Sequence, residues 1–161
     1  EPHQIVALYE EVCLVVRWKV VSQEDMVAYH RALAKLHRRF PERMAFLQVN
    51  RFSPKATIGM NAAAQEALLH VLEMYGHSLH VIALVLPDDP FVRASLRSTL
   101  TRIALLKRLR LNYRPFGELR PAVNAVCEAM RSPTRRPLQP AELEAAVAEL
   151  EKQRPTALAK D

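Results

Sequence analysis

The chain has 161 residues, of which 50% are hydrophobic and 25% charged, and its 23 Lys and Arg against 17 Asp and Glu give a formal net charge of +6. A chain of this length and apolar content normally folds as one domain, which excludes an intrinsically disordered protein. The chain has only three glycines, which excludes a collagen-like protein. Its two cysteines are widely separated, which excludes a disulfide-rich scaffold and a zinc ribbon.

The first apolar segment has the alternation of a β-strand. Large apolar residues occupy every second position from Val12 to Trp18, which puts Cys13 and Arg17 on the opposite face. The apolar segment 5–8 precedes it after a short polar turn, so we expect the two segments to pair as a hairpin.

From Ser22 onward, helical and strand patterns alternate. Ser22 with Asp25 three residues later predicts a helix N-terminus, because each side chain can bond the backbone of the other. We expect helices over 22–40, 61–75, 91–109 and 118–130, and strands over 44–49, 79–86 and 112–116. Gly76 is expected to end the second helix in a left-handed conformation. Because the 79–86 run is apolar on both faces, it is expected to be a central parallel strand.

This order predicts an α/β domain with a mixed, mostly parallel sheet of about four or five strands, about four packing helices and an additional C-terminal helix. The domain is expected over residues 1–131, with a linker rich in Pro and Arg over 132–140 and a C-terminal helix and tail over 141–161. The apolar stripe of that last helix is narrow and consists of Leu143, Val147 and Leu150. We therefore expect the helix to dock weakly, or to be covered by a partner or a second copy of the chain.

The positive charge is concentrated in one part of the chain. Residues 1–90 have a net charge of −1 and residues 137–161 a net charge of −2. Residues 91–136 contain 11 basic and 2 acidic side chains, a net charge of +9. The basic character therefore predicts a local surface and not a property of the whole molecule.

Part of this charge falls on one face of the helix expected over 91–109. At 100° per residue, the side chains that lie together beside the apolar stripe are Arg93, Arg97, Lys107 and Arg108, whereas Arg102 faces elsewhere. This face is a candidate binding surface for an acidic protein or another anion. The lack of interleaved aromatic residues and of nucleic-acid-binding motifs disfavours nucleic acid. The alternative is a solvated face in a chain with 17 Arg and 6 Lys.

Chemical motifs of the common enzyme classes are missing from the sequence. There is no Walker A loop, G-x-G-x-x-G, G-x-S-x-G or H-E-x-x-H string, so we expect no enzyme, no catalytic residue, no metal and no cofactor. The histidines that fall in pairs are His30 and His37, and His77 and His80. Neither pair has the spacing or the partners of a metal site, which favours partly buried, hydrogen-bonded roles. Cys13 and Cys127 are expected to be small buried hydrophobic residues. No apolar run is long enough to span a bilayer, so we expect a cytoplasmic protein.

The order of elements and several local strings resemble a known family. The features that carry the resemblance are the strand pair, the helix capped by Ser22, the 44–50 strand, the helix ending at Gly76, the 79–86 strand and the string Leu111-Asn-Tyr-Arg-Pro-Phe116. Over about residues 5–130 they resemble the STAS domain of anti-sigma-factor antagonists. The resemblance implies a STAS-like sheet.

In that family, a partner kinase phosphorylates a Ser or Thr in the loop between a strand and the next helix, and this releases the partner protein. By position, the resemblance implies Ser53 and Thr57 as candidate phosphorylation sites. A phosphate would add about −1.5 to −2 charges beside a helix N-terminus. In this chain Gln48 or Asn50 replaces the family's acidic residue after the strand.

Three functions follow from these observations. The resemblance implies a non-enzymatic regulatory module that binds another protein, such as a kinase or an anti-sigma factor, in a bacterial signalling pathway. The charge pattern offers a binder of an acidic ligand or nucleic acid through residues 93–108. A third alternative is a small-molecule or lipid binding protein whose pocket is not legible in the sequence.

Overall fold

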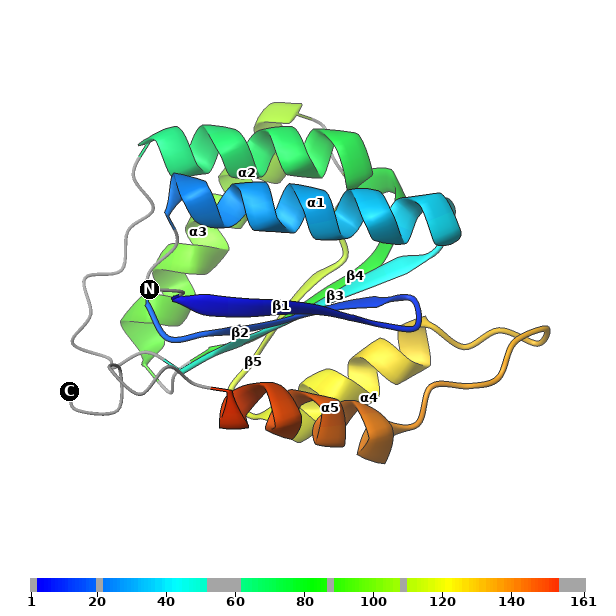
Figure 1. Ribbon diagram of the computed structural model, residues 1–161. Helices are drawn as coiled ribbons and strands as arrows, with labels where there is room; N and C mark the ends of the chain where they lie inside the picture. The colour runs from blue at the N-terminus through cyan, green and yellow to red at the C-terminus, as the bar shows by residue number, and fades with distance from the viewer. Residues whose placement is uncertain (1–2, 20–21, 52–61, 87–88, 108–109, 154–161) are drawn as a thin grey trace.

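The computed structural model shows one β-sheet with helices on both faces (Figure 1). It describes residues 3–19, 22–51, 62–86, 89–107 and 110–153, except for the side chains at 92, 95, 96, 99, 103, 104, 106 and 107. The strands are β1 (Gln4–Tyr9), β2 (Val12–Arg17), β3 (Met44–Asn50), β4 (Leu79–Val85) and β5 (Tyr113–Phe116). The helices are α1 (Gln23–Arg39), α2 (Ala62–Tyr75), the short 3₁₀ turn η1 (Gly76–Ser78), α3 (Pro90–Lys107), α4 (Leu119–Ala129) and α5 (Pro140–Lys152).

The sheet has the mixed, mostly parallel order that the sequence predicts. Its strands follow one another as β1-β2-β3-β4-β5, antiparallel between β1 and β2 and parallel elsewhere. The predicted hairpin is confirmed, and Glu10 closes its short turn with φ 49°, in the left-handed region. The predicted central strand is also confirmed, because β4 lies between β3 and β5 and is apolar on both faces.

Two helical layers cover the sheet. In Figure 1, α1, α2 and α3 lie on one side of it, and α4 and α5 lie on the other. The alternation along β2 sends Val12, Leu14 and Val16 into the core under α4 and α5. It sends Cys13 and Val15 into the core under the other three helices. Arg17, two residues further along β2, therefore also faces the α1 side.

The start of α1 is the capping box that the sequence predicts. The Asp25 N–H donates to Ser22 Oγ at 3.3 Å, and the Ser22 N–H donates to Asp25 Oδ2 at 2.7 Å. These reciprocal bonds fix where α1 begins and so which of its side chains face the sheet.

The prediction that Gly76 adopts a left-handed conformation is wrong. Among the glycines that the structure describes, none has a positive φ, and Gly76 instead begins η1, which leads directly into β4. A Cβ at Gly76 would lie 3.1 Å from Leu111 Cδ2. Close packing, and not backbone conformation, therefore favours a small residue at this position.

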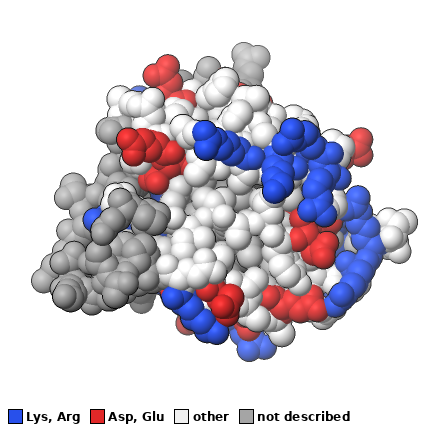
Figure 2. Space-filling model, in the orientation of Figure 1, with Lys and Arg blue, Asp and Glu red and all other residues white. Residues whose placement is uncertain are grey.

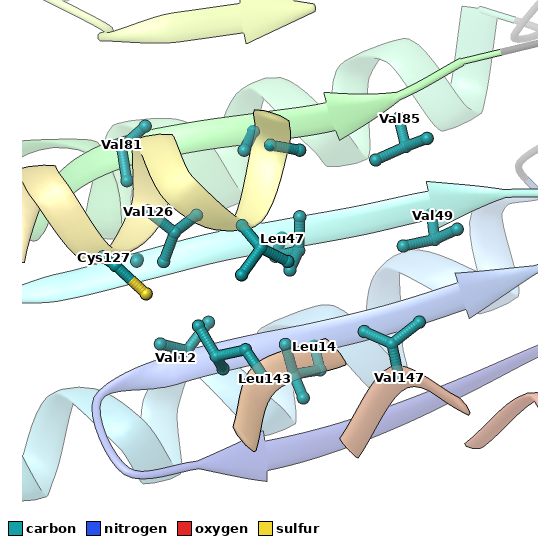
Figure 3. Close-up of a cluster of buried hydrophobic side chains, with 14 of the residues drawn as sticks. Val12, Leu14, Leu47, Val49, Val81, Val85, Val126, Cys127, Leu143 and Val147 are labelled. Carbon is teal, nitrogen blue, oxygen red and sulfur yellow. The ribbon is translucent and has the colours of Figure 1, made fainter. Parts of the chain in front are cut away.

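Helix α5 belongs to the domain core, so the expectation of weak docking is wrong. Leu143 and Val147 are 0% and 1% exposed and lie beside β2 in the close-up of Figure 3. The Tyr9 hydroxyl also donates to Glu142 Oε2 at 2.9 Å. A narrow stripe is sufficient because α4 covers β3 to β5 and leaves the β1 and β2 part of the sheet to α5. The stripe is therefore buried within its own chain and does not form a dimer surface.

Candidate functional site

A groove of about 960 Å³ lies between α3 and β5, the edge strand of the sheet. Arg93, Arg97 and Arg102 line it from α3, and Pro115 and Phe116 line it from β5. We call this surface the α3/β5 groove. None of the described residues that line it is acidic.

The groove brings together two of the four predicted binding residues. Arg93 and Arg97 line it as neighbours on one side of α3, and Arg102 lines it as well, although the helical wheel places it opposite Arg93. The prediction missed Arg102 because a wheel drawn for one helix does not show how far around α3 the groove extends. The side chain of Lys107 and the whole of Arg108 lie outside the described residues.

Apolar and aromatic side chains accompany these arginines. Leu105 lines the groove and is 74% exposed, and Phe91 is 75% exposed near the start of α3. Exposed large apolar side chains beside a groove are typical of a binding surface.

On β5, burial raises the pKa of Tyr113 to about 12, while the positive charge of Arg97 acts in the opposite direction. The Arg93 side chain crosses to the end of β5, where a Cβ at Gly117 would lie 2.6 Å from Arg93 Nη2.

A second group of polar side chains is buried at the carboxyl ends of β2 and β3, facing α1. Its members are Gln4, Arg17, Tyr29, Gln48 and Asn50, and we call it the buried polar cluster. Arg17 and Asn50 are directly paired in the β2–β3 register. Arg17 is 1% exposed.

Hydrogen bonds connect the cluster in one direction. Arg17 Nη2 donates to Gln4 Oε1 at 2.7 Å and to the Tyr29 hydroxyl. Tyr29 donates to Gln48 Oε1 at 3.0 Å, and Gln48 Nε2 donates to Asn50 Oδ1 at 2.8 Å. The chain ends where Asn50 Nδ2 donates to the Val85 carbonyl at 2.9 Å.

Sequence reasoning missed this cluster. Its signal was the polar side chains of Arg17, Gln48 and Asn50 at the ends of otherwise apolar strands. Burial raises the pKa of Tyr29, and the nearby Arg17 charge acts in the opposite direction. Tyr29 is therefore a neutral phenol at physiological pH.

The candidate phosphorylation sites that the family resemblance implies, Ser53 and Thr57, are not among the residues that the structure describes. At the base of the loop, Asn50 belongs to the buried polar cluster, and Arg51 Nε lies 2.6 Å from Glu151 Oε1 of α5.

The paired histidines differ in exposure. His30 and His37 are partly buried, as predicted, with His30 Nε2 at 3.4 Å from the Tyr75 hydroxyl and His37 Nδ1 at 3.3 Å from Ser78 Oγ. His77 and His80 are exposed, so the expectation that this pair is partly buried is wrong, although His80 Nε2 lies within hydrogen-bonding distance, 3.0 Å, of the Glu42 carbonyl. Within the described ranges, no group of three or more His, Cys, Asp and Glu side chains is arranged to hold a metal ion.

Both cysteines are buried, as predicted. Burial raises the pKa of Cys13 to about 12, and it also raises the pKa of Cys127. Both side chains are therefore protonated thiols at neutral pH, which disfavours either as a nucleophile.

A different basic surface occupies the face drawn in Figure 2. Lys and Arg side chains gather there over the C-terminal part of α1 and the neighbouring 131–139 segment, interspersed with acidic ones. Glu11, for example, lies 3.4 Å from Arg43 Nε and 2.9 Å from Arg135 Nη1. This surface is mixed in sign, whereas the lining of the α3/β5 groove is not.

None of the helices in the described ranges combines the length and the apolar character needed to cross a membrane. Neither a family model nor a curated protein matches the chain. Its backbone is similar to the crystal structure of an uncharacterised protein of the DUF3478 family from Shewanella loihica PV-4, which has a SpoIIAA-like fold. The TM-score is 0.51 with 13% sequence identity, and the match covers 77% of this chain and 93% of the other.

The chain has the SpoIIAA-like fold. This is the fold of STAS domains and anti-sigma-factor antagonists, so the fold that the sequence resemblance implies is confirmed. At 13% identity the likeness concerns the fold, and the function has to be argued from the sites of this chain.

Proposed function

We propose that this chain is a non-enzymatic regulatory module that binds an acidic segment of a partner protein in the α3/β5 groove. The observation that carries the proposal is the groove itself, in which three arginines and exposed apolar side chains meet with no described acidic residue among them. The STAS-like fold supports it, because the family that the sequence resembles acts by binding other proteins. The pathway in which we place the module is a cytoplasmic bacterial signalling pathway.

The groove has the chemistry to select one kind of peptide. Each guanidinium can form paired hydrogen bonds with a carboxylate, which gives orientation as well as charge complementarity. Leu105 and Phe116 add apolar side chains to the lining of the same groove. We therefore expect a partner segment in which acidic residues flank a large apolar side chain.

Side chains, and not main-chain pairing, are expected to dominate the binding. Although β5 is an edge strand, it has only four residues, and Pro115 in its middle has no N–H to donate. An added strand would therefore form a poor ladder on this edge.

Panning a library of short displayed peptides on the immobilised protein tests the proposal. We expect enrichment of acidic sequences with an apolar residue, which lose binding to the double variant Arg93→Glu/Arg97→Glu. The matched control is Arg38→Glu/Arg39→Glu, which reverses two exposed charges at the end of α1. Equal binding to both variants, at unchanged melting temperatures, would contradict the proposal. Preferential retention of DNA by the wild type would favour the nucleic-acid alternative instead.

The phosphorylation switch at Ser53 and Thr57 is a second proposal, supported by the family resemblance. Phosphate on this loop would place negative charge close to Arg51, which lies at its base. Mass spectrometry of the protein purified from its native cells should detect phosphate on one of the two residues. If Ser53 and Thr57 are unmodified under all growth conditions, the proposal of a phosphorylation switch is refuted.

A further inference from the structure

The buried polar cluster contains a positive charge, that of Arg17, which forms no ion pair with an acidic side chain of the described residues. A guanidinium has five N–H bonds. Arg17 Nη2 uses its two for Gln4 and Tyr29, while Nε and Nη1 are buried and have no hydrogen-bond partner among the described residues. Three of the five donors are therefore unpaired, on a side chain that is 1% exposed.

The nearest acidic side chain has another role. Asp25 is buried, but its carboxylate accepts from the Ser22 N–H in the capping box. The backbone carbonyl of Asp25 accepts from Gln4 Nε2 at 3.3 Å, and the negative charge of its carboxylate acts on Tyr29, but in the described residues this carboxylate makes no ion pair with Arg17. Within the described residues, every group that Arg17 contacts is neutral.

The one-directional hydrogen bonds make this arrangement specific for an anion. The acceptor atoms of Gln4 and Gln48 already receive hydrogen bonds, and the chain of donors ends on the Val85 carbonyl. The cluster thus offers unused donors at Arg17, and none of its five members is acidic. A buried charge left unpaired is strongly unfavourable, and an anion held there would remove that cost.

An apolar cavity of about 70 Å³ adjoins the cluster, between the sheet and helices α1, α2 and α3. Tyr29 and Gln48 belong to both, since they line the cavity and also form the hydrogen-bonded chain from Arg17. The rest of the lining is apolar and includes Leu33, Phe46 and Leu84. Arg17 is not itself a lining residue, so a ligand with an apolar body in this cavity would need a charged end that extends past Tyr29 to reach Arg17.

The size of the cavity limits the length of that body. An apolar protein cavity of about 150 Å³ is known to take up benzene. A cavity of about 70 Å³ suits a short aliphatic chain and excludes a long acyl chain. Its place in the fold agrees with a ligand site, because ligands of parallel sheets bind at the carboxyl ends of the strands, where Arg17 and Asn50 lie.

We propose that Arg17 and this cavity form a binding site for a short-chain aliphatic carboxylate, with the carboxylate on Arg17 and the chain in the cavity. This site shares no lining residue with the α3/β5 groove. The proposal therefore goes beyond the proposed partner binding. A metabolite bound here would make the module responsive to a small acid.

Calorimetric titration of the whole protein with sodium butyrate tests the proposal. We expect saturable binding of butyrate that is tighter than that of formate, which has no chain, and of octanoate, which is too long. 1-Butanol has a similar chain without the charge and should bind about tenfold more weakly or not at all. Equal affinities for formate, butyrate and octanoate, or for butyrate and 1-butanol, would overturn the proposal.

Arg17→Gln should weaken butyrate binding by about tenfold or more, because it removes the charge-assisted hydrogen bonds. Arg120→Gln, at an exposed arginine of α4, is the matched control and should bind butyrate as the wild type does. Trp18 fluorescence reports whether each variant is folded. If Arg17→Gln does not fold, the affinities of the wild type for butyrate and 1-butanol decide whether the proposal holds. Unchanged butyrate affinity in folded Arg17→Gln, or no binding of butyrate to the wild type, would refute the site.

Discussion

Replacing Leu143 by Ala tests whether α5 is an integral part of the domain. Leu143 is completely buried and packs in the same cluster as Val12 and Leu14 of β2, which are themselves buried (Figure 3). The substitution removes the side-chain contacts and leaves a cavity between a helix and a sheet that cannot close around it. Leu→Ala changes at such sites cost about 2–5 kcal/mol, and we expect about 3 kcal/mol here.

That loss is large on the scale of a whole domain, which is stable by about 5–15 kcal/mol. Urea unfolding measures this loss of unfolding free energy. It can be followed by the fluorescence of Trp18, the single tryptophan, which lies in the same core cluster as Leu143. With a slope of about 2 kcal/mol per molar urea, the midpoint should fall by about 1.5 M.

The matched control is Leu105→Ala, the same change on an exposed leucine of α3. It should alter the unfolding free energy by no more than about 0.5 kcal/mol. If Leu143→Ala costs less than about 1 kcal/mol, or no more than Leu105→Ala, α5 does not contribute to the core and the docking described above is refuted.

Three further predictions concern buried polar groups. Tyr113→Phe should stabilise the protein by about 1 kcal/mol at pH 7, because it removes a buried hydroxyl without a partner in the described residues. Because burial raises the pKa of Tyr113 from 10 to about 12, the unfolded state loses the phenol proton first, and the folded state loses stability as the pH rises from 10 to about 12. The Phe variant has no such proton and should lose less stability in alkaline urea titrations. Glu11→Gln should lower the unfolding free energy by about 1–3 kcal/mol, since it weakens the contacts with Arg43 and Arg135. Cys13, with its pKa raised to about 12, should react with a thiol reagent at pH 8 only after unfolding in urea.

Each of these predictions has a result that would contradict it. Tyr113→Phe with an unchanged alkaline profile would mean that the phenol is not held protonated by burial. Glu11→Gln should cost clearly more than Glu10→Gln at the neighbouring exposed position, and equal effects would remove the argument for the two ion pairs. Rapid modification of Cys13 in the folded protein would show that the strand is accessible.

Local patterns in the sequence were sufficient for most elements of the fold. Ser22 and Asp25 determine a helix start by their own hydrogen bonds, and the alternation from Val12 to Trp18 assigns two faces without knowledge of the rest of the chain. The docking of α5 could not be predicted in the same way, because it depends on how much of the sheet α4 leaves uncovered. The same holds for Gly76, whose size is restricted by Leu111.

The two candidate sites differ in how much of them a sequence reveals. Arg93 and Arg97 are one helical turn apart, so a helical wheel brings them together, whereas only the shape of the groove shows that Arg102 lines it as well. The buried polar cluster takes its members from β1, β2, α1 and β3. Only the register of the strands pairs Arg17 with Asn50, and no linear pattern contains that register.

The position of α5 over the first hairpin also has a consequence for how the protein is made. Tyr9 and Glu142 are 133 residues apart, and yet they are hydrogen-bonded. At a synthesis rate of about 5–20 residues per second, β1 and β2 leave the ribosome on the order of ten seconds before the helix that covers one of their faces. During this time Val12, Leu14 and Val16 have no α5 to pack against. We therefore expect this hairpin to be the segment of the nascent chain that most needs a chaperone, and folding to be completed only when residues near 150 have emerged.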